Sequence, residues 1–190
     1  MSPAHIVQMH GEPGSGKSTI SRAIGAALPA VVIDKDVIKA ALLRSDIVEA
    51  QASAGAYEVY FDLARHVIAQ GQSVILDNPV FWPQVERNWK RLADDAGSPH
   101  TMIECVCPDR DELVRRLATR DALESQPRAP LDLRRHPGTI VIDCERLTLD
   151  TTRPLAELID EALVYIRARP ATPAAPRSTV LTRQSEAARS

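Results

Sequence analysis

Short apolar runs alternate with segments of helical periodicity along most of the chain. The runs that predict strands are residues 5–9, 31–33, 74–76, 102–107 and 139–142. Between them, apolar positions that recur every three or four residues predict helices at 18–28, 37–43, 56–68, 83–96, 110–121 and 154–167. Strands that alternate with helices form parallel sheets, and most of these strands read as continuous apolar runs because both of their faces are buried. The pattern therefore predicts an α/β fold.

Two segments interrupt this alternation. Residues 122–138 contain three prolines and several arginines without a clear period, which indicates a long functional or disordered loop. Residues 170–190 are poor in large apolar side chains and rich in Ala, Pro, Ser, Thr and Arg, which predicts a disordered tail. We therefore expect one domain at residues 1–169, with a lid at about 121–138.

Composition excludes several classes of protein. The 190 residues carry a formal net charge of -2, which argues against a strong non-specific nucleic-acid binder. No apolar run approaches the roughly 18 residues that a membrane span needs. The three cysteines are odd in number and lack CxxC spacing, which favours reduced thiols and a cytoplasmic protein.

A glycine-rich motif follows the first predicted strand and opens the first predicted helix. Residues 11–18, GEPGSGKS, match GxxxxGK[ST] in full. Glycines let backbone N–H groups converge on phosphate oxygens, Lys17 can reach the terminal phosphates, and the Ser18 hydroxyl can bind Mg²⁺. The residues expected to bind the nucleotide are Gly11, Glu12, Pro13, Gly14, Ser15, Gly16, Lys17, Ser18 and Thr19.

Acidic residues end the second and third predicted strands. Asp77 closes VILD and is expected to hold Mg²⁺, while the next residue, Asn78, stands where motor ATPases usually place a glutamate. The [NT]KxD motif of GTPases is absent, so a phosphotransferase is favoured. Such an enzyme needs a carboxylate at the acceptor hydroxyl. Asp36 is the preferred candidate, and Asp34 either caps the following helix or binds the acceptor.

Arginines and one tryptophan complete the candidate site. Arg116 and Arg120 share a helical face and can together stabilise a polyphosphate. Trp82 either stacks on the acceptor or packs neighbouring helices together. His10, directly before the glycine-rich motif, is expected to support the site by packing. Three lid arginines are interpreted either as groups that close over the nucleotide or as surface charges, namely Arg128, Arg134 and Arg135.

Five segments together resemble the small P-loop kinases of the P-loop NTPase superfamily. They are GEPGSGKST, VVIDKDVIKAAL, VILDN, CPDRDELVRRLATR and TIVIDCERLTLD. The grouping includes chloramphenicol phosphotransferase, the zeta toxins and the kinase domain of polynucleotide kinase, and the resemblance spans roughly residues 5–168. It implies a three-layer fold with a five-stranded parallel sheet of order 2-3-1-4-5, an arginine-bearing lid, and Mg²⁺-ATP as donor.

The resemblance also suggests roles for particular residues. In several of these kinases DxxR follows the second strand, with the aspartate as base and the arginine on the acceptor. The matching residues here are Asp36 and Lys39, and lysine keeps the charge but loses the bidentate fork of arginine. The RxxxR motif of nucleoside-monophosphate kinases, which grips adenine and phosphates, falls on Arg116 and Arg120.

The leading hypothesis is an ATP-dependent phosphotransferase that uses a hydroxyl of a small molecule or nucleotide as acceptor. Its catalytic residues would be Lys17, Asp36, Arg116 and Arg120, with Asp34, Lys39 and Trp82 on the acceptor, and Ser18 and Asp77 on Mg²⁺. One alternative is an ATP-dependent switch or slow ATPase without an acceptor. Another is a polynucleotide 5′-hydroxyl kinase, which the near-neutral charge disfavours. The expected partners are a nucleotide triphosphate and a small acceptor, without nucleic acid or membrane.

Overall fold

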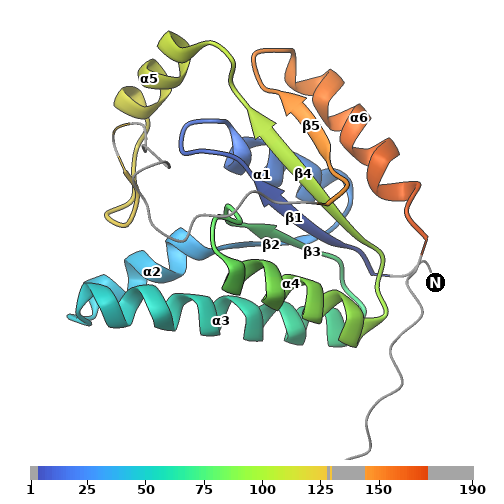
Figure 1. The fold of residues 1–190 in the computed structure, drawn as a ribbon, viewed down its shortest axis with the longest axis horizontal. Helices are drawn as coiled ribbons and strands as arrows, with labels where there is room; N and C mark the ends of the chain where they lie inside the picture. The colour runs from blue at the N-terminus through green and yellow to red at the C-terminus, as the bar shows by residue number, and fades with distance from the viewer. Residues whose placement is uncertain (1–3, 128, 130–143, 171–190) are drawn as a thin grey trace, which may run out of the picture.

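A computed structural model describes residues 4–127, 129 and 144–170 of the chain. Its strands are β1 (Ile6–His10), β2 (Val31–Asp34), β3 (Val74–Asp77), β4 (His100–Val106) and β5 (Leu147–Asp150). Its helices are α1 (Lys17–Ala27), α2 (Lys35–Arg44), α3 (Glu49–Ala69), α4 (Pro83–Ala96), α5 (Arg110–Thr119) and α6 (Leu155–Arg167). The five strands form one parallel sheet in the order β2-β3-β1-β4-β5 (Figure 1), which confirms the expected topology.

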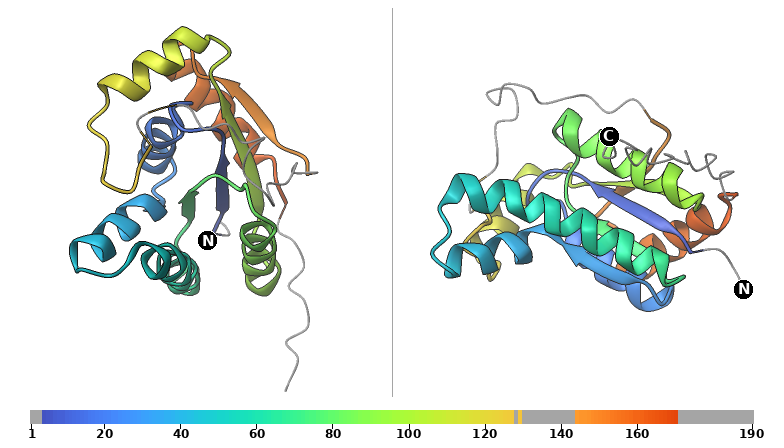
Figure 2. Two further views of the ribbon diagram at one scale, coloured as in Figure 1. Left: turned by 60° about the vertical axis from the view of Figure 1, so that its left-hand side comes forward. Right: turned by 90° about the horizontal axis from the view of Figure 1, so that it is seen from below.

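Helices cover both faces of the sheet because its inner strands are apolar on both sides. Along β1, Ile6 joins a core with α3 and α4, whereas its neighbour Val7 joins a core with α1 and α6. Strand β3 divides in the same way, with Val74 and Leu76 on the first face and Ile75 on the second. The result is the expected three-layer arrangement, seen edge-on in Figure 2.

The fifth strand lies later in the chain than we expected. The segment 139–142 falls outside the described residues, and the strand that pairs with β4 is Leu147–Asp150, in register from Ile103↔Leu147 to Val106↔Asp150. Strand β5 forms an edge of the sheet, with Leu149 buried and Thr148 exposed. Its apolar residues therefore alternate, and a search for continuous apolar runs misses it.

Two helix ends also differ from the periodic pattern. Helix α3 begins at Glu49, seven residues before the expected start at 56, because its first turns carry small residues instead of large apolar ones. Helix α5 begins as expected, with Asp109 Oδ1 accepting from the backbone N–H groups of Asp111 and Glu112 at 3.0 Å each. It ends at Thr119, so Arg120 already has an extended backbone.

The part of the chain that the structure describes contains no helix that is both long and apolar enough to cross a membrane. The expected tail and most of the expected lid lie outside the described residues.

The carboxyl ends of β1, β2 and β3 all reach the same edge of the sheet, since these strands are parallel neighbours. In open α/β sheets ligands bind at this edge.

Candidate active site

The loop between β1 and α1 is shaped by three glycines. Gly11, Gly14 and Gly16 have φ values of 129°, 84° and 90°, in the left-handed region that favours glycine. A Cβ at Gly11 would lie 2.2 Å from the carbonyl oxygen of Cys105, and one at Gly16 would lie 3.2 Å from Thr151. The loop therefore packs against β4 and against the turn after β5, and at these glycines side chains are excluded. This geometry fits a backbone cradle for phosphate groups.

Lys17 is folded back over this loop. Its ammonium group donates a hydrogen bond to the carbonyl oxygen of Glu12 at 2.9 Å. Burial lowers the pKa of Lys17, and the negative charge of Asp77 counters that shift. A half-buried cation that caps the loop is well placed to bind an anion that enters the cradle.

Asp77 is the buried acid of the site. Burial raises its pKa to about 6, with a further rise from nearby Asp34, while Lys17 and hydrogen bonds from Ser18 and Ser21 act in the opposite direction. Carboxylate and hydroxyl oxygens are ligands suited to Mg²⁺, so Asp77 and Ser18 fit the roles expected of them. No cluster of three or more His, Cys, Asp or Glu side chains able to hold a metal occurs among the described residues.

A cavity of about 540 Å³ opens above the phosphate loop. It is bounded by the phosphate loop, α1, the ends of β2 and β3, the end of α5, and residues 121–127. Figure 1 shows this last segment running from α5 towards α2. The expected site residues that line the cavity are Pro13, Gly14, Gly16, Lys17, Ser18, Thr19, Asp34, Asp36, Asp77, Arg116 and Arg120. Residues scattered over 108 positions of sequence thus meet around one space large enough for a ligand.

Asp34 and Asp36 occupy different positions at the end of β2. Asp34 Oδ1 accepts a hydrogen bond from the backbone N–H of Asp36 at 2.8 Å, which makes Asp34 the N-cap of α2. Burial raises the pKa of Asp34. Asp36 sits in the first turn of α2, with one carboxylate oxygen 2.7 Å from Lys35 Nζ. Both line the cavity, and the capping role of Asp34 favours Asp36 as the acid that meets the acceptor.

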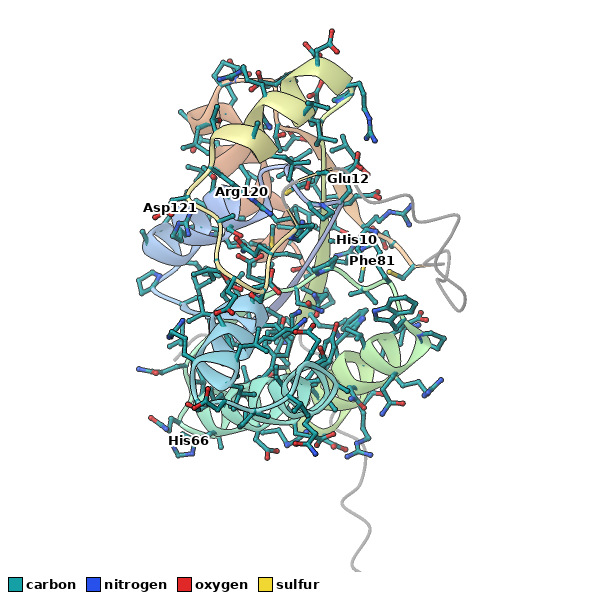
Figure 3. All side chains as sticks on the ribbon, turned by 90° about the vertical axis from the view of Figure 1, so that its left-hand side faces the viewer. His10, Glu12, His66, Phe81, Arg120 and Asp121 are labelled. Atoms are coloured by element: carbon teal, nitrogen blue, oxygen red, sulfur yellow. The ribbon has the colours of Figure 1, made fainter. Side chains whose placement is uncertain are left out.

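The two expected arginines are held by the protein in different ways. Arg116 donates from Nη1 to Thr151 Oγ1 at 2.8 Å, from Nη2 to the Thr151 carbonyl at 2.9 Å, and from Nε to Glu112 at 2.7 Å. Arg120 donates to the carbonyl oxygen of Pro127. Figure 3 shows Arg120 beside Asp121, on the side of the site that carries α1. Both arginines line the cavity and border the phosphate loop.

Some expected residues lie outside the cavity lining. Lys39 forms an ion pair with Glu49 at the start of α3. Trp82 is the N-cap of α4 and packs against the core beneath it. The Glu12 carboxylate lies 3.2 Å from Arg110. Their proposed contacts with nucleotide or acceptor stay predictions. The lid arginines fall outside the described residues, namely Arg128, Arg134 and Arg135.

Other lining residues were not foreseen. Arg22 follows Ser18 by four positions on α1, so helical spacing from the motif could have identified it. Pro79 follows the acid of β3 closely in sequence. Thr119 and Gln126 depend on where α5 ends and how the next segment folds, which no local motif reveals.

His10 ties the end of β1 to the segment after β3. Its Nδ1 accepts from the backbone N–H of Val80 at 3.2 Å, and its ring meets Phe81 edge-on with centroids 5.5 Å apart (Figure 3). Glu104 Oε1 lies 3.8 Å from Nε2. Burial lowers the pKa of His10 to about 4, although Glu104 partly offsets this effect. The packing role expected from sequence fits these contacts.

The lowered pKa of His10 predicts a pH-dependent contribution to stability. Between pH 6.5 and 4 the unfolded state protonates this imidazole while the folded state keeps it neutral, so the free energy of unfolding falls as the pH falls. His10→Asn should remove this dependence, and the difference between variant and wild type should change by about 2–3 kcal/mol between pH 7 and pH 4. Urea unfolding at several pH values measures it. The exposed His66→Asn should change the pH dependence far less, and parallel curves for His10→Asn and wild type would contradict the expectation.

Comparison with known proteins agrees with this geometry. The sequence profile of the AAA domain family (AAA_33) matches residues 6–136. No curated protein sequence matches the chain significantly. Among solved structures, a protein from Chloroflexus aurantiacus, provisionally assigned as a kinase, is 22% identical with a TM-score of 0.70, and the alignment covers 90% of this chain and 100% of that one.

Two further structures carry kinase names. The APS kinase of Mycobacterium tuberculosis, solved with AMPPNP and APS, is 18% identical with a TM-score of 0.62, covering 88% of this chain and 100% of that one. A gluconokinase from Sinorhizobium meliloti is 19% identical with a TM-score of 0.54, covering 87% of this chain and 92% of that one. At these identities the likeness establishes a shared fold.

Proposed function

The chain belongs to the AAA domain family, and on that premise we propose that it is a P-loop kinase, which transfers the γ-phosphate of Mg²⁺-ATP to a hydroxyl of a small molecule or nucleotide. One observation carries this proposal. A single cavity is lined both by the lysine of the phosphate loop and by an acidic residue, Asp36, in the first turn of α2. A nucleotide-binding module needs the first of these groups, whereas a phosphotransferase needs both.

The phosphate side of the cavity would bind the donor. The glycine-shaped loop and the start of α1 present backbone N–H groups to the phosphates. Lys17 would leave the Glu12 carbonyl for phosphate oxygens, and Arg116 and Arg120 would stabilise charge on the transferred group. Magnesium, held by Ser18 and Asp77, would neutralise part of the phosphate charge.

The acceptor side would activate the hydroxyl. Asp36 would accept the hydroxyl proton as the acceptor oxygen forms a bond to the γ-phosphorus. The bond between that phosphorus and the β–γ bridging oxygen breaks, and ADP leaves with its electron pair. Each transfer thus yields a phosphorylated acceptor, ADP and one proton.

Labelled ATP provides the decisive experiment. The purified protein is incubated with Mg²⁺ and ATP carrying ³²P at the γ position, together with hydroxyl compounds that include an oligonucleotide with a free 5′-hydroxyl. Label on a small acceptor supports the proposal. Release of free phosphate alone supports a switch or slow ATPase, and label on the oligonucleotide supports a polynucleotide kinase. Calorimetry that detects no Mg²⁺-dependent affinity for ATP or GTP would overturn the whole interpretation.

A further inference from the structure

The charges that line the cavity are unevenly distributed. The lining cations lie on α1, which includes Lys17, and at the end of α5. Three other walls complete the cavity. The first is the end of β2 with the start of α2, the second is the end of β3 with Pro79, and the third is residues 121–127. We call these three walls the acceptor end. Its described lining residues include the carboxylates of Asp34, Asp36 and Asp121, besides that of Asp77, which would hold Mg²⁺, and no lysine or arginine.

The two lysines of α2 are already paired with carboxylates. Lys35 pairs with Asp36 at 2.7 Å and lies over the ring of Tyr57, with Nζ 5.5 Å from the centroid. Lys39 pairs with Glu49. Neither lysine lines the cavity. An anionic acceptor would therefore have to break one of these ion pairs to gain either lysine of α2 as a partner.

The carboxylates at this end are only partly balanced. Lys35 neutralises Asp36, and Lys17 lies beside Asp77. Asp34 accepts hydrogen bonds from the backbone N–H groups of Asp36 and Val37 and forms no ion pair among the described residues. Burial and the neighbouring Asp36 both oppose the charge of Asp34. A second anion placed here would meet the same repulsion. Hydroxyl and ammonium groups, in contrast, can donate to carboxylate oxygens.

The cations on the opposite side do not reverse this balance. Arg116 is anchored to Thr151 and Glu112, next to the phosphate loop. Arg120 donates to the carbonyl oxygen of Pro127, a residue of the acceptor end, and this hydrogen bond occupies part of its guanidinium group. Arg22 is exposed, so water and salt screen its charge. When ATP is bound, its negatively charged phosphates interact with the same cationic side chains. The acceptor end stays acidic.

We propose that the acceptor is an uncharged or positively charged hydroxyl compound, such as a polyol or an amino alcohol, and that Asp34 is the residue that excludes anionic acceptors. This inference rests on the phosphotransferase function proposed above and narrows its substrate class. Neutral acceptors donate O–H groups to the carboxylates and to the Gln126 amide oxygen, and Leu123 and Val37 provide apolar contact. Hydroxy acids and sugar phosphates are disfavoured.

The test compares acceptors that differ in charge. Sorbitol, glucose, glucosamine and ethanolamine represent the favoured classes, and gluconate, glucose 6-phosphate and glycerate the disfavoured one, in the labelled-ATP assay at pH 8. We expect label on neutral or cationic compounds, with kcat/KM at least about tenfold above that for anionic compounds of similar size. Label chiefly on an anionic compound would overturn this inference but leave the phosphotransferase function intact. Label on no compound of any class would overturn both.

An asparagine variant separates charge from structure. Asp34→Asn keeps a side-chain oxygen that can cap α2 and removes the negative charge. It should reduce the preference for uncharged over anionic acceptors by about tenfold or more, through better kcat/KM for the anions. Asp109→Asn is the matched control, because Asp109 caps α5 in the same way outside the cavity lining and its replacement should leave the preference unchanged. An unchanged preference in Asp34→Asn would contradict the role assigned to Asp34.

Discussion

Replacing Asp36 with asparagine is expected to lower the rate of phosphoryl transfer by about 10²–10⁴-fold, because the acceptor hydroxyl loses the group that takes its proton. The affinity for Mg²⁺-ATP should change by less than about threefold, since Asp36 lies at the acceptor end and the donor phosphates are bound by another wall of the cavity. Initial rates with a labelled acceptor and calorimetric titration with a non-hydrolysable ATP analogue measure the two quantities.

A matched variant controls for the loss of one carboxylate. Asp62→Asn removes the same charge from an exposed position on α3, where the carboxylate pairs with Arg65 and with no other described residue. Its rate and affinity should match those of the wild type. A marked loss of ATP affinity in Asp36→Asn would place Asp36 in the donor site instead. Asp34 would then be the remaining candidate for the base.

The phosphate loop could be predicted from sequence because its chemistry is local. Eight consecutive residues contain the glycines, the lysine and the hydroxyl that phosphate binding requires, and the structure gives those glycines backbone angles that other residues rarely adopt. The sheet order followed from the resemblance and is confirmed. Asp77 was predictable for a related reason, since an acid that ends a buried apolar strand next to β1 must reach the same edge of the sheet.

Features that depend on tertiary packing were harder to predict. Strand β5 was placed too early because an edge strand alternates apolar and polar residues. The resemblance to kinases with DxxR assigns Lys39 to the acceptor, and that contact stays a prediction. What the sequence did not reveal is its ion pair with Glu49, which the early start of α3 brings close. The periodic pattern did not reveal that start. Sequence spacing predicts which side of a helix a residue occupies, but it does not predict which side chain of a neighbouring element pairs with it.

The segment after α5 illustrates the same limit. Arg116 and Arg120 both line one cavity, although Arg120 lies beyond the end of the helix whose face they were expected to share, and their contact with a polyphosphate stays a prediction. Ser125 Oγ donates to the Asp36 carbonyl oxygen at 2.8 Å, which joins the segment after α5 to the first turn of α2. These residues are 89 positions apart, and no motif in either segment indicates the contact. This contact closes one side of the cavity and helps to define the acceptor end.

Replacing Lys17 with methionine should lower kcat by about 10²–10³-fold and also weaken ATP binding, because the terminal phosphates lose the cation of the phosphate loop. Methionine keeps an unbranched apolar chain of similar length, so the loop can retain its packing. The loss of positive charge beside Asp77 should raise the pKa of that carboxyl above its wild-type value of about 6, since Lys17 opposes the shift that burial produces. The affinity of the variant for Mg²⁺-ATP should therefore decline at a higher pH than that of the wild type when the pH is lowered.

Calorimetric titrations at pH 8, 7 and 6 and single-turnover assays measure these effects. Lys90→Met is the control, because Lys90 pairs with Glu86 on the outer surface of α4 and lies outside the cavity lining. If Lys17→Met bound ATP as tightly as the wild type and still transferred phosphate at a comparable rate, the loop would not hold the triphosphate. The assignment of Asp36 as base would then also lose its basis, because it assumes that the loop holds the phosphate that is transferred to the acceptor beside Asp36.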